Sequence, residues 1–215
     1  MPYSRGQVDW TLWSVFNRSG GQVPPTAFTR RITKLAELGV PFGMEDRPGK
    51  GGVIPYTEQS VFVQAVGLTL LDGGFTQGDV AFLLKDQRKY LANAFEAIMR
   101  NRPGRRMRIL ATDQPQSPTR PNDNMFADTS YFMTFRKVEL REAYSAAARI
   151  DPNKPFIFTP KYFVGLGKLS IEMARLAESD ENICTVVELS YLADMVVHFL
   201  EQAPDVKRGR RKLEG

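Results

Sequence analysis

The chain has 215 residues, of which 42% are hydrophobic and 25% are charged, and this composition is typical of a folded globular protein. A single cysteine, Cys184, and a single histidine, His198, exclude an intrachain disulfide, a cysteine-based zinc cluster and any metal site that needs two histidines. The 29 lysines and arginines outnumber the 24 aspartates and glutamates, so the net charge of +5 permits a polyanionic partner. The longest apolar stretch, 61–71, is much shorter than the roughly 20 residues of a membrane span, so we expect a cytoplasmic protein with no membrane partner.

Two helices are predicted before the first glycine-rich segment. The first covers 8–17, and three aromatic side chains are expected to face the core: Trp10, Trp13 and Phe16. The second covers 26–38, after two prolines, and ends at Gly39. Its apolar residues are three and four positions apart, which predicts one buried side made of Phe28, Ile32 and Leu35.

The glycine-rich stretch 40–56 predicts two short strands with a tip at 48–50, that is, a wing. Thr57 is a suitable N-cap for a third helix, which is expected to end near Leu71. Thr76, with Asp79 three residues later, predicts a capping box at the start of a fourth helix.

This fourth helix is expected to be long and to reach Met99. Its apolar positions are spaced four, three, four, three and four residues apart: Val80, Leu84, Gln87, Leu91, Ala94 and Ile98. One interpretation is the core-facing side of an ordinary helix. The other is a seam against the same helix of a second subunit, in which Leu84, Leu91 and Ile98 would be dimer contacts.

The second half of the chain alternates short β-rich runs with helical runs. Strands are predicted at 106–112, 131–136, 156–159 and 184–189, and helices at 138–150, 161–177 and 190–202. The sequence thus predicts an α+β protein with two domains, 1–102 and 103–215, the second being a small α/β or α+β domain with a basic tail at 206–215.

Catalytic chemistry is not expected in either half. The run Gly165-Leu166-Gly167-Lys168-Leu169-Ser170 lacks the first glycine of a phosphate-binding loop, and Leu169 stands where serine or threonine should bind magnesium. No nucleophile or acid–base motif is present, so we predict no catalytic residues, no metal site and no cofactor.

A family resemblance emerges from the motifs around the predicted wing and fourth helix. The wing exit is Gly52-Val53-Ile54-Pro55-Tyr56-Thr57, and the run from Leu70 to Leu84 reads Leu-Leu-Asp-Gly-Gly-Phe-Thr-Gln-Gly-Asp-Val-Ala-Phe-Leu-Leu. With Gly39 at the end of the second helix, residues 23–99 resemble the DNA-binding domain of the MerR family of bacterial transcription regulators. The resemblance implies a winged helix-turn-helix followed by a long helix that forms an antiparallel dimer, which the seam at 80–98 would suit.

The outer side of the predicted helix 26–38 is the expected DNA-binding face. It belongs to a segment, 10–36, that contains no acidic residue. Arg30 is the best candidate for a guanine contact, because a planar guanidinium can donate to two acceptors, and Lys34 is expected on phosphate. The complete set of predicted DNA contacts, from this helix and the wing, is Thr26, Arg30, Arg31, Thr33, Lys34, Arg47, Lys50 and Tyr56. For Tyr56 the alternative is a buried aromatic side chain, and for Arg31 it is packing at the flank of the core.

These observations favour a homodimeric transcription regulator that binds double-stranded DNA and is associated with the bacterial nucleoid. Residues 103–215 would bind a small-molecule or protein effector or serve in assembly. Two alternatives stay open: a protein-interaction adaptor, and a non-specific nucleoid or mobile-element DNA-binding protein. An enzyme is not expected.

Overall fold

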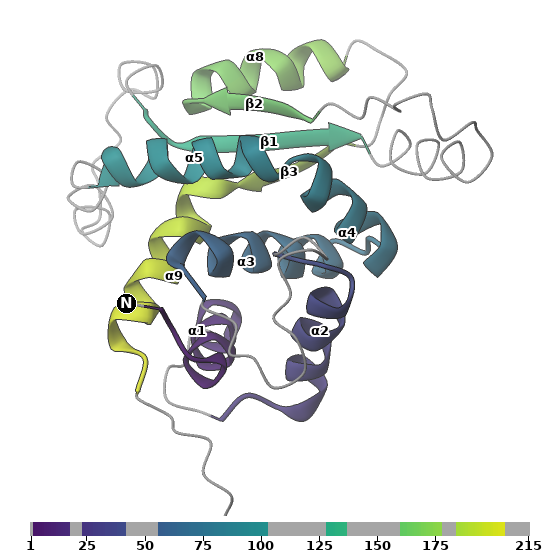
Figure 1. Cartoon of the computed structure of the whole chain (residues 1–215). Coiled ribbons are helices and arrows are strands. Elements are labelled where there is room, and N and C mark those ends of the chain that lie inside the picture. Colours follow the sequence, from purple (N-terminus) through teal and green to yellow (C-terminus); the bar gives the residue numbers. More distant parts are fainter. Residues whose placement is uncertain are drawn as a thin grey trace, which may run out of the picture.

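The computed structural model describes residues 2–17, 23–41, 56–102, 128–136, 160–177 and 184–204. These residues form an α+β fold, as predicted, with three layers in Figure 1: a layer of helices, a small sheet, and one helix on the outer side of the sheet. The elements in chain order are α1 (Arg5–Asn17), α2 (Thr26–Glu37), α3 (Glu58–Asp72), α4 (Gln77–Asp86), α5 (Arg88–Arg100), β1 (Tyr131–Arg136), β2 (Lys161–Val164), α8 (Leu166–Ala177), β3 (Cys184–Glu188) and α9 (Leu189–Gln202). None of the helices in these ranges is long and apolar enough to cross a membrane.

Local capping determines where α3 and α4 begin, and both predicted starts are confirmed. The Thr57 hydroxyl accepts a hydrogen bond from the Ser60 backbone N–H at 3.2 Å, and the Thr76 hydroxyl accepts one from the Asp79 N–H at 3.2 Å. In both cases the side chain three residues on accepts a hydrogen bond from the N-cap backbone, which completes a capping box. Gly74, with φ of 81°, makes the turn between the two helices.

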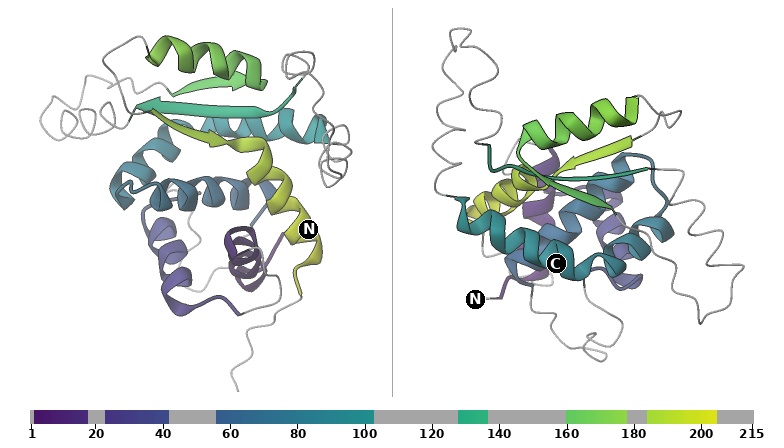
Figure 2. Two further views of the ribbon diagram at one scale, coloured as in Figure 1. Left: turned by 180° about the vertical axis from the view of Figure 1, so that it is seen from behind. Right: turned by 90° about the horizontal axis from the view of Figure 1, so that it is seen from above.

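The sheet is antiparallel, with strand order β2-β1-β3. Met133 at its centre pairs with Tyr162 on one side and Val187 on the other. Helix α8 covers one face, and the layer that contains α5 and α9 lies against the other face, as the front and back views agree (Figure 2). Strands predicted at 106–112 and 156–159 and the helix predicted at 138–150 lie outside the described residues.

The helix predicted over 161–177 begins later than expected. Residues 161–164 form β2, Gly165 turns the chain with φ of 88°, and α8 follows. Lys161–Val164 contains aromatic and β-branched residues that pair with β1, and pairing between strands is not visible in a local helical pattern.

The predicted division at residue 102 does not separate two cores. Helix α9, from the second half, packs against α1, α3 and α5, and Trp10 of α1 meets Phe199 edge-on with ring centroids 6.1 Å apart. At the end of α5, Arg102 forms ion pairs with Asp194 and Glu201 of α9. The buried apolar residues of α1–α5 and α9, together with Met133, Phe135 and Val187 of the sheet, form one hydrophobic cluster.

The long fourth helix predicted over 76–99 is also corrected, because it is two helices that meet at Gln87. The Gln87 side chain is buried, donates to the Asp86 carboxylate at 2.5 Å and accepts from the Tyr162 hydroxyl of β2 at 3.0 Å. The seam residues Leu84, Leu91 and Ile98 are 2%, 0% and 0% exposed within a single chain. They are therefore core residues, and in this structure they do not present a coiled-coil seam to a second subunit.

Helix α3 lies at the centre of the helical layer, and residues 60–68 are all buried (Figure 1). Among them is Gln64, which is completely buried, and neither its amide oxygen nor its nitrogen has a hydrogen-bond partner among the described residues. An unpaired buried amide opposes folding, because it has lost its water.

We therefore expect Gln64→Met to raise the free energy of unfolding by about 1–3 kcal/mol, since methionine has a similar shape and no polar atoms to desolvate. Urea denaturation of the full chain measures this. Gln59→Met, on the same helix at a half-exposed position, is the matched control and should change stability by less than about 0.5 kcal/mol. A loss of stability in the Gln64 variant would contradict the expectation.

Candidate nucleic-acid interface

Helix α2 carries most of the predicted DNA contacts, and its position follows from its apolar side. Phe28, Ile32 and Leu35 are buried, as predicted, and the Phe28 ring meets Trp13 of α1 edge-on with centroids 5.1 Å apart. Gly39, with φ of 88°, ends the helix as predicted. Figure 1 shows α1 nearly end-on while α2 runs in the plane of the picture, so the two helices cross steeply.

The opposite side of α2 faces solvent. Its polar residues Thr26, Arg30, Thr33 and Lys34 are all exposed, so the four side chains predicted to share one face do so. The Lys34 ammonium pairs with Glu37 at 3.0 Å, with side chains about half exposed. An ion pair this exposed contributes little free energy, so it does not prevent Lys34 from contacting another anion.

Arg31 lies at the flank of this face, and its side chain points toward the end of α3. Its Nη2 atom is 2.6 Å from an Asp72 carboxylate oxygen at the end of α3. The ion pair joins α2 to α3, in line with the alternative interpretation of Arg31 as a flanking residue.

Tyr56 is a correction to the predicted set. Its side chain is 2% exposed, so it is a buried aromatic and not a surface contact for phosphate. The Arg5 Nη1 atom donates to its hydroxyl at 3.2 Å, and its backbone oxygen accepts from the Tyr3 N–H at 2.9 Å. Arg47, Lys50 and the tip of the predicted wing lie outside the described residues, so a winged helix-turn-helix is not confirmed.

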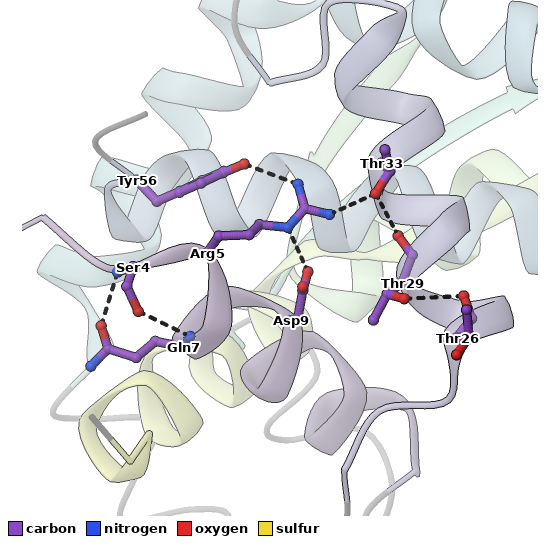
Figure 3. A network of polar contacts seen from close by, with 8 residues as sticks. All are labelled: Ser4, Arg5, Gln7, Asp9, Thr26, Thr29, Thr33 and Tyr56. Atoms are coloured by element: carbon purple, nitrogen blue, oxygen red, sulfur yellow. Dashed lines mark hydrogen bonds and ion pairs between the residues drawn. The ribbon is translucent and has the colours of Figure 1, made fainter. Parts of the chain in front are cut away.

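Arg5 is the residue that the sequence interpretation missed. Its guanidinium contacts Asp9 through Nε at 2.7 Å, the Tyr56 hydroxyl through Nη1 at 3.2 Å and the Thr33 hydroxyl through Nη2 at 3.2 Å (Figure 3). The four-residue spacing of Arg5 and Asp9 is the only sequence signal for this network. The contact with Thr33 is 28 residues away along the chain, and no local pattern predicts it.

The same network orients hydroxyl groups along α2. The Thr33 hydroxyl donates to the Thr29 carbonyl at 2.9 Å, and the Thr29 hydroxyl donates to the Thr26 carbonyl at 3.0 Å (Figure 3). With its proton given to Thr29, the Thr33 oxygen accepts from Arg5. Arg5 therefore places a cationic group directly beside the exposed face of α2.

The N-terminal segment is also tied to the start of α3. The Tyr3 hydroxyl donates to a Glu58 carboxylate oxygen at 3.4 Å. Burial, and then the negative charge of Glu58, raise the pKa of Tyr3, so its hydroxyl keeps its proton near neutral pH.

The start of α8 does not offer an open phosphate site. The Leu166 N–H donates to an Asp128 carboxylate oxygen at 3.3 Å, so an acidic side chain already occupies the position that an anion would take.

Two titratable side chains around β2 have shifted pKa values. Burial, and then the charge of Asp86, raise the pKa of Tyr162, whose hydroxyl donates a hydrogen bond to Gln87. The hydrogen bond from Lys161 lowers the pKa of Glu172, and this pair links β2 to α8.

No group of three or more metal-binding side chains occurs within the described ranges. Comparisons of the chain with known protein families, with curated proteins and with solved structures found no match. The resemblance of residues 23–99 to the MerR family therefore rests on the sequence motifs alone.

Proposed function

We propose that this protein binds double-stranded DNA through the exposed face of α2, the face formed by Thr26, Arg30, Thr33 and Lys34. Arg30 carries the proposal. It is exposed, and it forms no ion pair within the described part of the chain. Arg31 beside it pairs with Asp72. An exposed guanidinium amid short polar side chains on a helix surface is suited to reading base edges in the major groove.

Arg5 and Lys34 support this face electrostatically. Arg5 lies at one side of it, hydrogen-bonded to Thr33, and Lys34 lies on it, paired with the exposed carboxylate of Glu37. Cations beside a groove-binding helix contact phosphates and position the helix.

The wider role that we propose is that of a homodimeric transcription regulator, cytoplasmic and associated with the nucleoid, with an effector bound by residues 103–215. This part rests on the resemblance of residues 23–99. A dimer would need a surface other than Leu84, Leu91 and Ile98, because those side chains lie in the core.

A protein-interaction adaptor is the second candidate, and helix α8 favours it. Three of its apolar side chains are exposed, namely Leu166, Ile171 and Met173, and Ile171 is 63% exposed. An apolar side chain as exposed as that of Ile171 is a candidate contact with another protein.

Fluorescence anisotropy with a mixed-sequence DNA duplex at about 50 and 200 mM salt tests the DNA proposal. We expect wild-type affinity to fall roughly tenfold or more between these concentrations, because several phosphates release counterions on binding. Arg30→Ala should weaken binding by about tenfold, and Lys34→Ala should reduce the salt slope by about one unit.

Two substitutions on α8 are matched controls, because they remove the same charges from a different surface. Arg175→Ala and Lys168→Ala, both at exposed positions, should leave the affinity within about twofold of wild type. Equal losses in the α2 and α8 variants would contradict the assigned face. No binding at low salt would contradict DNA binding itself.

A further inference from the structure

A cavity of about 180 Å³, partly open to solvent, lies between the turn that follows α2 and helices α3, α4 and α5. Its walls are the turn after α2 (Gly39, Val40 and Pro41), one residue of α3, two of α4 and the first residue of α5. The residues from these three helices are Val63, Leu84, Lys85 and Arg88.

The apolar walls are rigid parts of the core. Val40, Val63 and Leu84 are 3%, 6% and 2% exposed, so their positions are set by packing on their other sides. A buried apolar cavity of about 150 Å³ is large enough to hold benzene. This cavity therefore has room for one six-membered ring, or a branched chain of similar size, and a small polar substituent.

The polar groups at the cavity are cationic. Lys85 is exposed, at the last turn of α4, and it forms no ion pair within the described part of the chain. Arg88 is three residues further on and also lines the cavity. The nearest acid along the chain, Asp86, accepts a hydrogen bond from Gln87. A pocket lined by apolar side chains, a lysine and an arginine fits a ligand that has a hydrocarbon body and a negative charge.

We propose that this cavity binds a small aromatic or branched aliphatic carboxylate. Its hydrocarbon part lies against Val63 and Leu84, and its carboxylate contacts Lys85 and Arg88. The bound molecule also touches Gly39–Pro41, the residues that directly follow α2. The proposal does not rest on DNA binding, and the test below contains no DNA.

Benzoate is the probe, added to the full chain labelled with ¹⁵N and followed by two-dimensional NMR. We expect a dissociation constant of about 1 mM or lower, which is the range for a ligand of this size. The amide signals that move should be those of residues 39–41, 63 and 84–88. Benzamide, which has the same shape without the charge, should bind at least about tenfold more weakly.

Variants separate the charge from the apolar walls. Lys85→Gln should weaken benzoate binding by about tenfold, and Val63→Phe should abolish it by filling the cavity. Lys89→Gln removes the same charge from an exposed position outside the lining and should leave binding unchanged. The NMR spectrum of each variant also reports its fold, and Lys85→Gln alone decides the test if Val63→Phe does not fold.

Three results would overturn the proposal. The first is no shift with benzoate up to about 20 mM, well above the expected dissociation constant. The second is equal binding of benzamide and benzoate. The third is an equal loss in the Lys85 and Lys89 variants, which would indicate non-specific attraction of the anion to surface charge.

Discussion

A fragment that ends at residue 102 is expected to be unfolded, although it contains the whole of the domain predicted from sequence. The reason is α9, which buries apolar side chains against α1, α3 and α5. These side chains are Leu189, Leu192, Ala193, Val196, Val197, Phe199 and Leu200. Burial of one large apolar side chain contributes about 1.5–3 kcal/mol, so the loss of α9 removes about as much as the 5–15 kcal/mol by which a domain is usually stable.

Circular dichroism during thermal unfolding measures this, with a fragment of residues 1–204 as the control that retains α9. We expect a cooperative transition for 1–204 and none for 1–102.

In the full chain, Val196→Asp should lower the free energy of unfolding by more than about 4 kcal/mol, because it places a charge in the core. His198→Asp, exposed on the same helix, should have a small effect. A cooperative transition in the 1–102 fragment would show that the first half folds alone and that the single core is the wrong description.

Arg5→Met is expected to lower the free energy of unfolding by about 3 kcal/mol, a large effect for a residue at the edge of the fold. The substitution removes the cation that pairs with Asp9, whose side chain is 5% exposed, and a buried carboxylate without its cation is costly. It also removes the hydrogen bonds from Arg5 to Tyr56 and Thr33. Urea denaturation gives the magnitude.

Arg31→Met is the matched control, because its ion pair with Asp72 is equally short but exposed. The partner side chain is 51% exposed in that pair, and we expect a loss below about 1 kcal/mol. The double variant Arg5→Met, Asp9→Leu should recover most of the loss, because it removes the buried charge together with its partner. Equal losses at Arg5 and Arg31, or no recovery in the double variant, would contradict a role for the buried charge pair.

The candidate site was only partly predictable from the sequence. The three-and-four spacing of Phe28, Ile32 and Leu35 is enough to orient α2, so the exposure of Arg30 and Lys34 followed from it. The burial of Tyr56 could not be predicted from a local sequence pattern, because its neighbour Arg5 is 51 residues away along the chain. The ion pair between Arg31 and Asp72 could not be predicted either, because it joins the middle of α2 to the end of α3.

The seam around Leu84 shows why a correct apolar pattern does not by itself identify the surface that covers it. Its four-and-three spacing identifies the buried side of α4 and α5, and those residues are buried. The spacing does not say which surface covers them. In the structure that surface belongs to the same chain, where the Phe62 ring of α3, for example, lies 5.2 Å from the Phe95 ring of α5.

By itself, the sequence determined the features that depend on neighbours a few residues apart: the N-cap at Thr57, the capping box at Thr76, the stop at Gly39 and the apolar side of α2. Hydrogen bonds within one helical turn and the helical repeat are local, so they can be recognised in a short stretch of chain. Only the tertiary structure decided that α9 completes the core of α1, α3 and α5, and that β2 interrupts a helical pattern. It also decided that the long predicted helix divides at Gln87, whose side chain accepts a hydrogen bond from Tyr162, 75 residues away. These features depend on which apolar surfaces exclude water together, and that is settled by contacts between distant segments.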